Sequence, residues 1–140
     1  MQTVSLNDSW EAKAGDCYFS QVGNKEHLFI VLFEPDFYPN EGYGKRACIV
    51  SVNITSVSQY KAIDEACIIE VGEHEFIKHT SYIYYEKIQF VDYEHVKQCV
   101  NSGVYRKATP VSATLLDKII AGIFTSSFIP RKFKVIFKDK

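Results

Sequence analysis

The strongest constraint on how this chain can fold is a change in the spacing of its apolar residues near Asp92. Before Asp92, apolar residues alternate with polar ones or run together, as in Cys17–Val22, His27–Phe33 and Arg46–Thr55. Both patterns predict short β-strands. After Asp92 the apolar residues recur every three or four positions, which is the period of a helix. The sequence therefore predicts strands first and helices afterwards.

Two further strands are expected at Cys67–Val71 and Tyr82–Val91. The segment Glu34–Gly44 holds two prolines and two glycines together with Asn and Asp, and this composition predicts a long loop between strands. Loops of that length often carry function.

The helical part contains two capping signals. Asp92 can cap a helix that ends near Gly103, and Ser112 can cap a second helix. One face of the second helix is apolar, at Leu115, Leu116, Ile119, Ile120 and Ile123. Beyond Pro130, apolar residues alternate with lysines and predict a closing strand. Its apolar positions are Phe133, Val135 and Phe137.

This order of elements predicts a mainly β chain with C-terminal helices, an α+β fold. We expect a small, strongly bent antiparallel barrel with two helices packed outside it and a closing strand. The chain has 140 residues, which fits one domain spanning residues 1–140.

Charge and cysteine usage narrow the function classes. The net charge of −1 predicts no strong overall attraction to nucleic acid or membrane. The last ten residues are nevertheless basic, and this tail is either a partner contact or a solvated terminus.

The four cysteines form no C-x-x-C pair, and three lie in apolar runs, at Cys17, Cys48 and Cys67. Without a signal peptide or an apolar membrane span, we expect a cytoplasmic protein with no membrane partner.

The densest cluster of proton-transferring groups is Glu73–Tyr85, which contains two of the four histidines. His79 lies beside Lys78 and is a candidate for proton transfer. His74 lies between two glutamates after a glycine, so an exposed turn is expected there. A metal held by His74 and His79 would lack a third ligand, and we predict no metal and no cofactor.

The order of elements resembles the MazF/PemK toxin family, whose members are endoribonucleases on an SH3-like barrel. The resemblance rests on Gly15-Asp16-Cys17-Tyr18 as the turn into the first strand, on the strands His27–Phe33, Arg46–Ser56 and Glu86–Phe90, and on the helix Ser112–Phe124. It implies cleavage of RNA, a homodimer and an antitoxin protein as partner.

The resemblance also implies where the site lies. The family has a basic residue, usually Arg, just before the second strand, and a Thr or Ser at the end of the third. In this sequence His27 and Thr55, followed by Ser56, fall at those positions.

Metal-independent cleavage of RNA needs a base for the 2′-hydroxyl proton and an acid for the leaving 5′-oxygen. Two histidines can share these roles at neutral pH, and His27 and His79 are the candidates. The residues expected to contact single-stranded RNA are Lys78, Ser81, Tyr82, Arg46 and Tyr43. Tyr82 and Tyr84 could stack on bases, whereas Tyr85 is expected in the core. Arg46 and Tyr43 belong to an aromatic and basic loop that could close over RNA.

Two other functions stay open at the level of sequence. The first is a non-catalytic barrel that binds a protein or nucleic acid through this loop and the basic tail, in a regulatory or phage-defence-linked role. The second is a hydrolase with Ser81 or Cys17 as nucleophile, although neither residue has the glycine pattern of a nucleophile elbow. The nuclease hypothesis requires His27, Thr55 and His79 to converge on one concave face.

Overall fold

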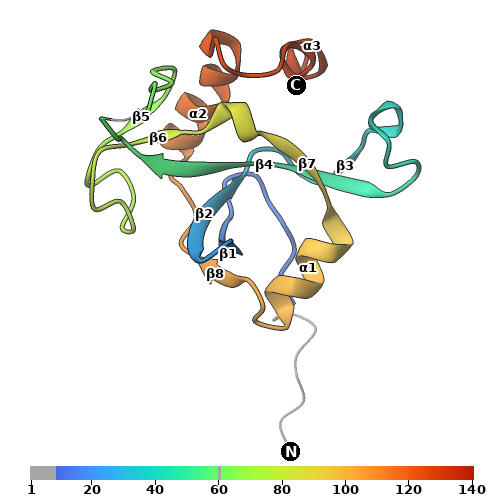
Figure 1. The fold of residues 1–140 in the computed structure, drawn as a ribbon. Helices are drawn as coiled ribbons and strands as arrows, with labels where there is room; N and C mark the ends of the chain where they lie inside the picture. The colour runs from blue at the N-terminus through green and yellow to red at the C-terminus, as the bar shows by residue number, and fades with distance from the viewer. Residues whose placement is uncertain (1–8, 60) are drawn as a thin grey trace, which may run out of the picture.

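The computed structural model describes residues 9–59 and 61–140 (Figure 1). The strands are β1 Cys17–Val22, β2 Lys25–Val31, β3 Asp36–Phe37, β4 Ala47–Ser56, β5 Ile68–Ile69, β6 Ser81–Ile83, β7 Gln89–Asp92 and β8 Arg106–Ala108. The helices are α1 Tyr93–Asn101, α2 Ala113–Thr125 and α3 Arg131–Phe137, with short 3-10 turns η2 Pro39–Glu41 and η3 Tyr85–Lys87.

The sheet is organised around β4. Its strand order is β5-β6-β4-β2-β1-β8, and β3 and β7 pair with β4 as well. Each pairing is antiparallel. In Figure 1, β4 crosses the middle of the molecule, with the β1–β2 hairpin and β8 on one side and α2 and α3 on the other. The predicted α+β class is therefore confirmed as a mostly antiparallel β-sheet with C-terminal helices.

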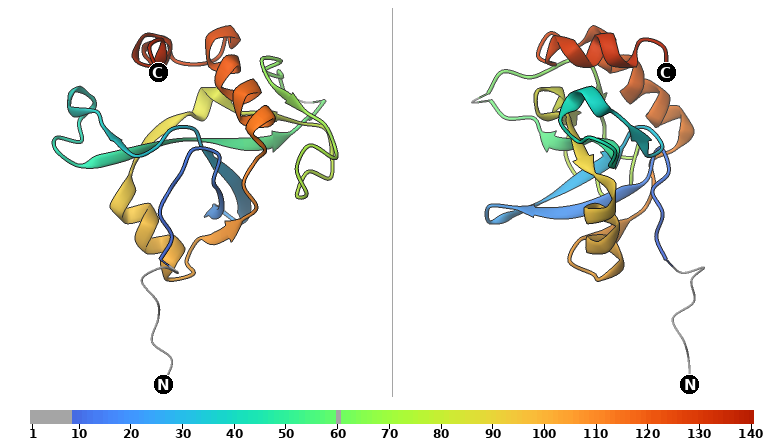
Figure 2. Two further views of the ribbon diagram at one scale, coloured as in Figure 1. Left: turned by 180° about the vertical axis from the view of Figure 1, so that it is seen from behind. Right: turned by 90° about the vertical axis from the view of Figure 1, so that its right-hand side faces the viewer.

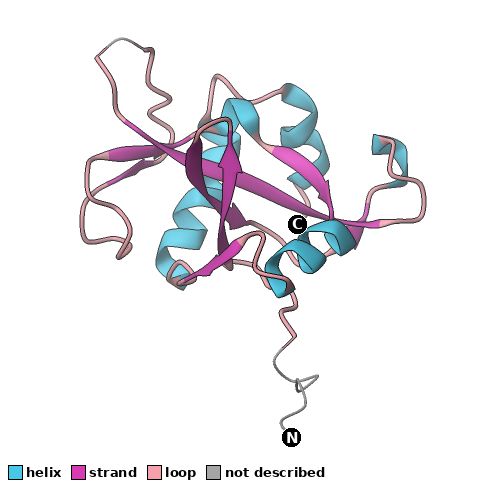
Figure 3. Cartoon of the chain, turned by 60° about the horizontal axis from the view of Figure 1, so that its bottom comes forward, coloured by secondary structure: helices cyan, strands magenta, loops and turns pink. Residues whose placement is uncertain are grey.

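β4 has apolar side chains on both of its faces, because successive residues of a strand point to opposite sides. On one face Val50 and Val52 join the larger core, which α2 closes with Leu115, Ile119 and Ile123. On the other face Ile49 joins a smaller core with Trp10, Tyr18, Phe29 and Val31, which α1 closes with Val96 and Val100. The helices consequently lie around the outside of the strands (Figure 3).

Both predicted helix caps are confirmed. The Asp92 side chain accepts a hydrogen bond from the backbone N–H of Glu94 at the start of α1. The Ser112 hydroxyl accepts one from the N–H of Leu115 at the start of α2, over 3.0 Å. Each bond satisfies a backbone donor that the helix itself leaves unpaired.

The predicted closing strand at the C-terminus is wrong, because this segment forms α3. Phe133 and Phe137 are four residues apart, so one face of a helix can bury both, and their rings pack on Phe90. Val135 is 58 % exposed, whereas a strand with the predicted alternation would bury it. The last strand of the sheet is instead the three-residue β8, which pairs with β1 and has no apolar alternation to reveal it.

The expected strand Tyr82–Val91 is interrupted. It forms β6 and β7 with the 3-10 turn η3 between them, where the Tyr85 hydroxyl donates to the carbonyl of Ile119 over 2.6 Å. Tyr85 is fully buried, as predicted. The three cysteines in apolar runs are also buried and free. No helix within the described residues is both long and apolar enough to span a bilayer.

Candidate functional site

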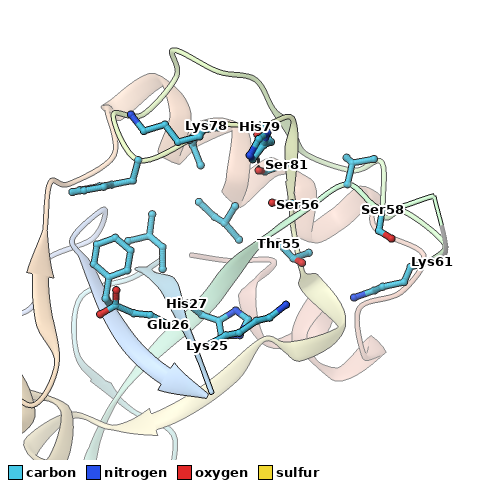
Figure 4. Close-up of a pocket in the computed structure, with 16 residues that line it drawn as sticks. Lys25, Glu26, His27, Thr55, Ser56, Ser58, Lys61, Lys78, His79 and Ser81 are labelled. Atoms are coloured by element: carbon cyan, nitrogen blue, oxygen red, sulfur yellow. Dashed lines mark hydrogen bonds between the residues drawn. The ribbon is translucent and has the colours of Figure 1, made fainter. Parts of the chain in front are cut away.

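A pocket of about 680 Å³ lies where β2 begins and β4 ends. Three segments of the chain form its walls (Figure 4). The β1–β2 hairpin contributes Phe19 and residues 25–28, the end of β4 and the following loop contribute residues 54–58 and Lys61, and the segment before and into β6 contributes residues 76–79 and Ser81. The pocket therefore combines residues that are up to about 60 positions apart in the chain.

Strand register explains why these segments meet. β2 and β4 pair from Val31–Ser51 to Phe29–Asn53, so the residues just beyond this ladder, His27 on one strand and Thr55 on the other, lie at the same end of the pair. β4 and β6 pair Ser56 with Ser81, and the N–H of Val57 donates to the carbonyl of Thr80 over 3.1 Å. This brings the residues just before β6, including His79, to the end of β4.

His27, Thr55 and His79 accordingly line the same pocket. In Figure 4, His27 and His79 lie on opposite sides of it, with Thr55 between them. His27 is half-buried and His79 is exposed. Over residues 9–59 and 61–140, ring hydrogen bonds of histidine involve His74 and His95, so the rings of His27 and His79 keep their nitrogens free. Two free imidazoles facing one pocket can give and take protons.

His74 differs from both and corrects the expectation of an exposed turn. It is 6 % exposed, and its Nε2 donates to the carbonyl of Thr109 over 2.6 Å. Its Nδ1 accepts from the N–H of Phe76 over 3.2 Å, and this pairing fixes a neutral ring with the proton on Nε2. His74 thus anchors the segment that carries His79 to the end of β8.

The pocket has an excess of positive charge. Its cations are Lys25, Lys61 and Lys78, and its one carboxylate is Glu26. That carboxylate is paired with Arg106 over 2.7 Å. The Arg106 guanidinium also lies 4.1 Å from the centre of the Phe19 ring, which holds it beside the pocket. Such a site favours an anionic ligand.

The hydroxyl and thiol groups near the site differ in availability. Thr55 is half-buried and faces the pocket, whereas Ser81 is buried and its Oγ donates to the carbonyl of His79 over 2.8 Å. Cys17 is buried too, and burial raises the pKa of its thiol to about 12. Neither Ser81 nor Cys17 is therefore an accessible nucleophile, which disfavours the hydrolase hypothesis.

The structure places three of the predicted RNA-binding residues outside this pocket. Tyr82 is 2 % exposed and lines a neighbouring pocket with Lys61, Tyr84 and Phe128. Tyr43 donates its hydroxyl to the carbonyl of Phe90 over 2.9 Å, and Arg46 pairs with Asp92 over 2.8 Å. The aromatic and basic loop thus rests on β7, at the opposite end of β4.

Three basic residues at or beside the pocket were not predicted. Lys25 could have been found, because it stands two residues before His27 on the same strand and so points to the same side. Lys61 comes from a loop and Arg106 from the unpredicted β8, and neither carries a pattern that marks it. Within the part of the chain that the structure describes, no three His, Cys, Asp or Glu side chains cluster as metal ligands would.

Comparison with known proteins supports the fold. No protein-family model and no curated protein sequence matches the chain. Among solved structures, it is similar to a chain from an endoribonuclease in complex with its cognate antitoxin, from a mycobacterial species. The match has a TM-score of 0.50 and 15 % sequence identity, and it covers 85 % of this chain and 97 % of the other. The fold therefore agrees with the resemblance to MazF/PemK-like toxins.

Proposed function

We propose that this protein is a metal-independent endoribonuclease of the toxin–antitoxin type that cleaves single-stranded RNA. The observation that carries the proposal is one cationic pocket in which the unpaired rings of His27 and His79 flank Thr55. We place this site on one SH3-like, strongly bent barrel domain spanning residues 1–140.

The two histidines would divide the proton transfers of a transesterification. The 2′-oxygen attacks the adjacent phosphorus, and one neutral imidazole takes its proton. The bond from phosphorus to the 5′-oxygen breaks, and the other, protonated imidazole gives its proton to that oxygen. The products are a 2′,3′-cyclic phosphate and a 5′-hydroxyl, so atoms and charge balance without water or a metal ion.

The remaining residues would hold the phosphate and the RNA strand. Thr55 and Lys78 donate to the phosphate oxygens, whose negative charge grows as the new bond forms. Ser81 positions His79 by donating to its carbonyl. Tyr82 is too buried to contact RNA itself and would instead support the half-buried ring of Tyr84, which it touches in the neighbouring pocket. Arg46 with Tyr43 would meet a strand that continues toward the other end of β4.

The similar solved structure supports a protein partner, because that endoribonuclease is bound to its cognate antitoxin. We therefore propose that an antitoxin binds this protein and blocks the cationic pocket, and that the active form is a homodimer.

The test is incubation of defined single-stranded RNA with the protein in EDTA. His27→Ala and His79→Ala should each lower the cleavage rate about a hundredfold or more, because a general acid or base contributes at least that much. His95→Ala, an exposed histidine on α1, is the matched control and should cleave at the wild-type rate. Full activity of His79→Ala would refute the assignment, and binding without any cleavage would instead support the non-catalytic barrel.

A further inference from the structure

The short C-terminal helix α3 has two faces with different roles. Phe133 and Phe137 point into the larger core. On the opposite side, at spacings of three, four and seven residues, stand Arg131, Lys134, Val135 and Lys138, which therefore share one helical face. We refer to Arg131, Lys134 and Lys138 as the basic face of α3. Figure 2 shows α3 on the outside of the molecule, beside the end of α2.

The basic residues of this region divide into paired and unpaired sets. Lys132 forms an ion pair with Glu41 over 3.0 Å, and Lys140 forms one with Asp36 over 2.8 Å, so these two fasten α3 to β3 and η2. The three residues of the basic face form no ion pair with the described residues. They line a hollow of about 500 Å³ together with Ser126, Ser127 and Ile129. Three uncompensated cations around one hollow form a site for a polyanion.

Shared lining residues connect this hollow to the cationic pocket. Lys61 lines both the cationic pocket and the neighbouring pocket of Tyr82 and Tyr84. Phe128 lines that neighbouring pocket and a further one, which in turn shares Ser127 with the hollow at α3. A series of neighbouring pockets therefore leads from His27 and His79 to the basic face.

The two middle pockets of this series suit bases rather than phosphates. Glu65 and Glu86 are exposed there and would repel a phosphate, while Tyr84 is half-buried beside Lys61 and Phe128 is 40 % exposed. Aromatic side chains can stack on bases of any sequence. A polyanion with bases between its charges fits this alternation better than an acidic peptide does.

We infer that the basic face of α3 is a second phosphate-binding site for the same single-stranded RNA whose cleavage is proposed for the cationic pocket. The inference rests on the proposed function for its ligand and concerns binding alone. It makes affinity depend on RNA length, because a short strand fills the pocket while only a longer one also reaches α3.

The experiment measures the binding of non-cleavable 2′-O-methyl RNAs of about 4 and about 16 nucleotides at several salt concentrations. The triple variant Arg131→Gln/Lys134→Gln/Lys138→Gln should bind the long RNA about ten- to a hundredfold more weakly at 0.1 M salt. The slope of log K against log[salt] should become shallower by about 2, the value for three released phosphate contacts on a single strand. Affinity for the short RNA should be unchanged.

The matched control removes the same charge from lysines outside these pockets and that loop, in Lys13→Gln/Lys97→Gln/Lys107→Gln, and should keep the wild-type slope. Circular dichroism and urea unfolding establish that both triple variants fold. An unchanged salt slope in the α3 variant, or an equal loss of affinity for the long RNA in both triple variants, would overturn the inference. So would an α3 variant that loses affinity for a polyglutamate peptide but not for the long RNA.

The outcomes also separate this inference from the proposed function. If the protein cleaves no RNA but the α3 variant lowers the salt slope for the long RNA alone, the binding site stands and the proposed nuclease does not. A protein that cleaves RNA but shows the same salt slope with and without the α3 substitutions keeps the nuclease and loses the second phosphate-binding site.

Discussion

The Tyr85 hydroxyl occupies the space where Gly122 has no side chain. A Cβ at Gly122 would collide with the hydroxyl and ring of Tyr85, and the hydroxyl is held there by its hydrogen bond to the carbonyl of Ile119. The close approach joins η3 to the middle of α2. It therefore fixes the turn between β6 and β7 against the helix that closes the larger core.

We expect Gly122→Ala to destabilise the protein by about 1–3 kcal/mol in urea unfolding, because the new methyl group overpacks a full site. Helix propensity alone predicts that Gly122→Ala would stabilise the protein, since alanine is favoured over glycine by about 1 kcal/mol within a helix. Tyr85→Phe removes the colliding oxygen, so the double variant should lose less stability than the sum of the single variants. A Gly122→Ala protein as stable as the wild type would show that this contact does not constrain the fold.

His74→Phe should cost about 1–3 kcal/mol while nearly preserving volume, because it leaves the N–H of Phe76 and the carbonyl of Thr109 without their partners. The amide of Phe76 should also exchange its hydrogen faster, since the segment before β6 loses its anchor. His95→Ala serves as the exposed control and should change stability by less than about 0.5 kcal/mol. Equal effects of the two substitutions would contradict a structural role for His74.

Glu26→Gln should strengthen binding of non-cleavable RNA about two- to fivefold at low salt, because it removes the one carboxylate of the pocket and releases Arg106. Stability should change by less than about 1 kcal/mol, since both partners of this ion pair are largely exposed. Glu94→Gln removes an exposed carboxylate on α1 and controls for net charge. Stronger binding in both variants would show that overall charge, not the pocket, is responsible.

Alkaline pH should unfold the protein in a way that depends on Tyr18. Burial raises the pKa of Tyr18 to about 12, whereas an unfolded tyrosine has a pKa of about 10. The contribution of Tyr18 is therefore fully present below about pH 10. Above that pH it declines by about 1.4 kcal/mol per pH unit, because the unfolded chain releases a proton that the folded chain retains up to about pH 12.

Tyr18→Phe should flatten the fall of stability between about pH 10 and 12 by that amount, in urea titrations at a series of pH values. Burial raises the pKa of the Cys17 thiol to about 12 as well, so Cys17→Ala should flatten the decline that starts nearer pH 9. Slopes identical to the wild type in both variants would mean that these groups ionise alike in the folded and unfolded chain.

The elements that the sequence predicted correctly are those that local chemistry specifies. The caps at Asp92 and Ser112 and the apolar stripe of α2 each determine a helix without help from distant residues. In α3, Phe133 and Phe137 fit a helical spacing of four as well as a strand spacing of two, and packing on Phe90 selects the helix. Nothing local distinguishes the two alternatives.

The same reasoning applies to the site. The family resemblance implied His27 and Thr55, and the polar neighbours of His79 marked it as a candidate. The burial of His74 could not be foreseen, since its partner Thr109 is 35 residues away and the adjacent glutamates suggested exposure. Lys61 and Arg106 likewise reach the pocket only through the folded chain.

The central position of β4 has a consequence for synthesis on the ribosome. Its hydrogen-bonded neighbours span residues 29–92, so β4 must wait for segments on both sides of it to emerge. A nascent chain that stops before Phe76 lacks the wall that carries His79 and has no complete pocket. If the proposed nuclease is correct, the nascent chain cannot cleave RNA until more than half of it has been made.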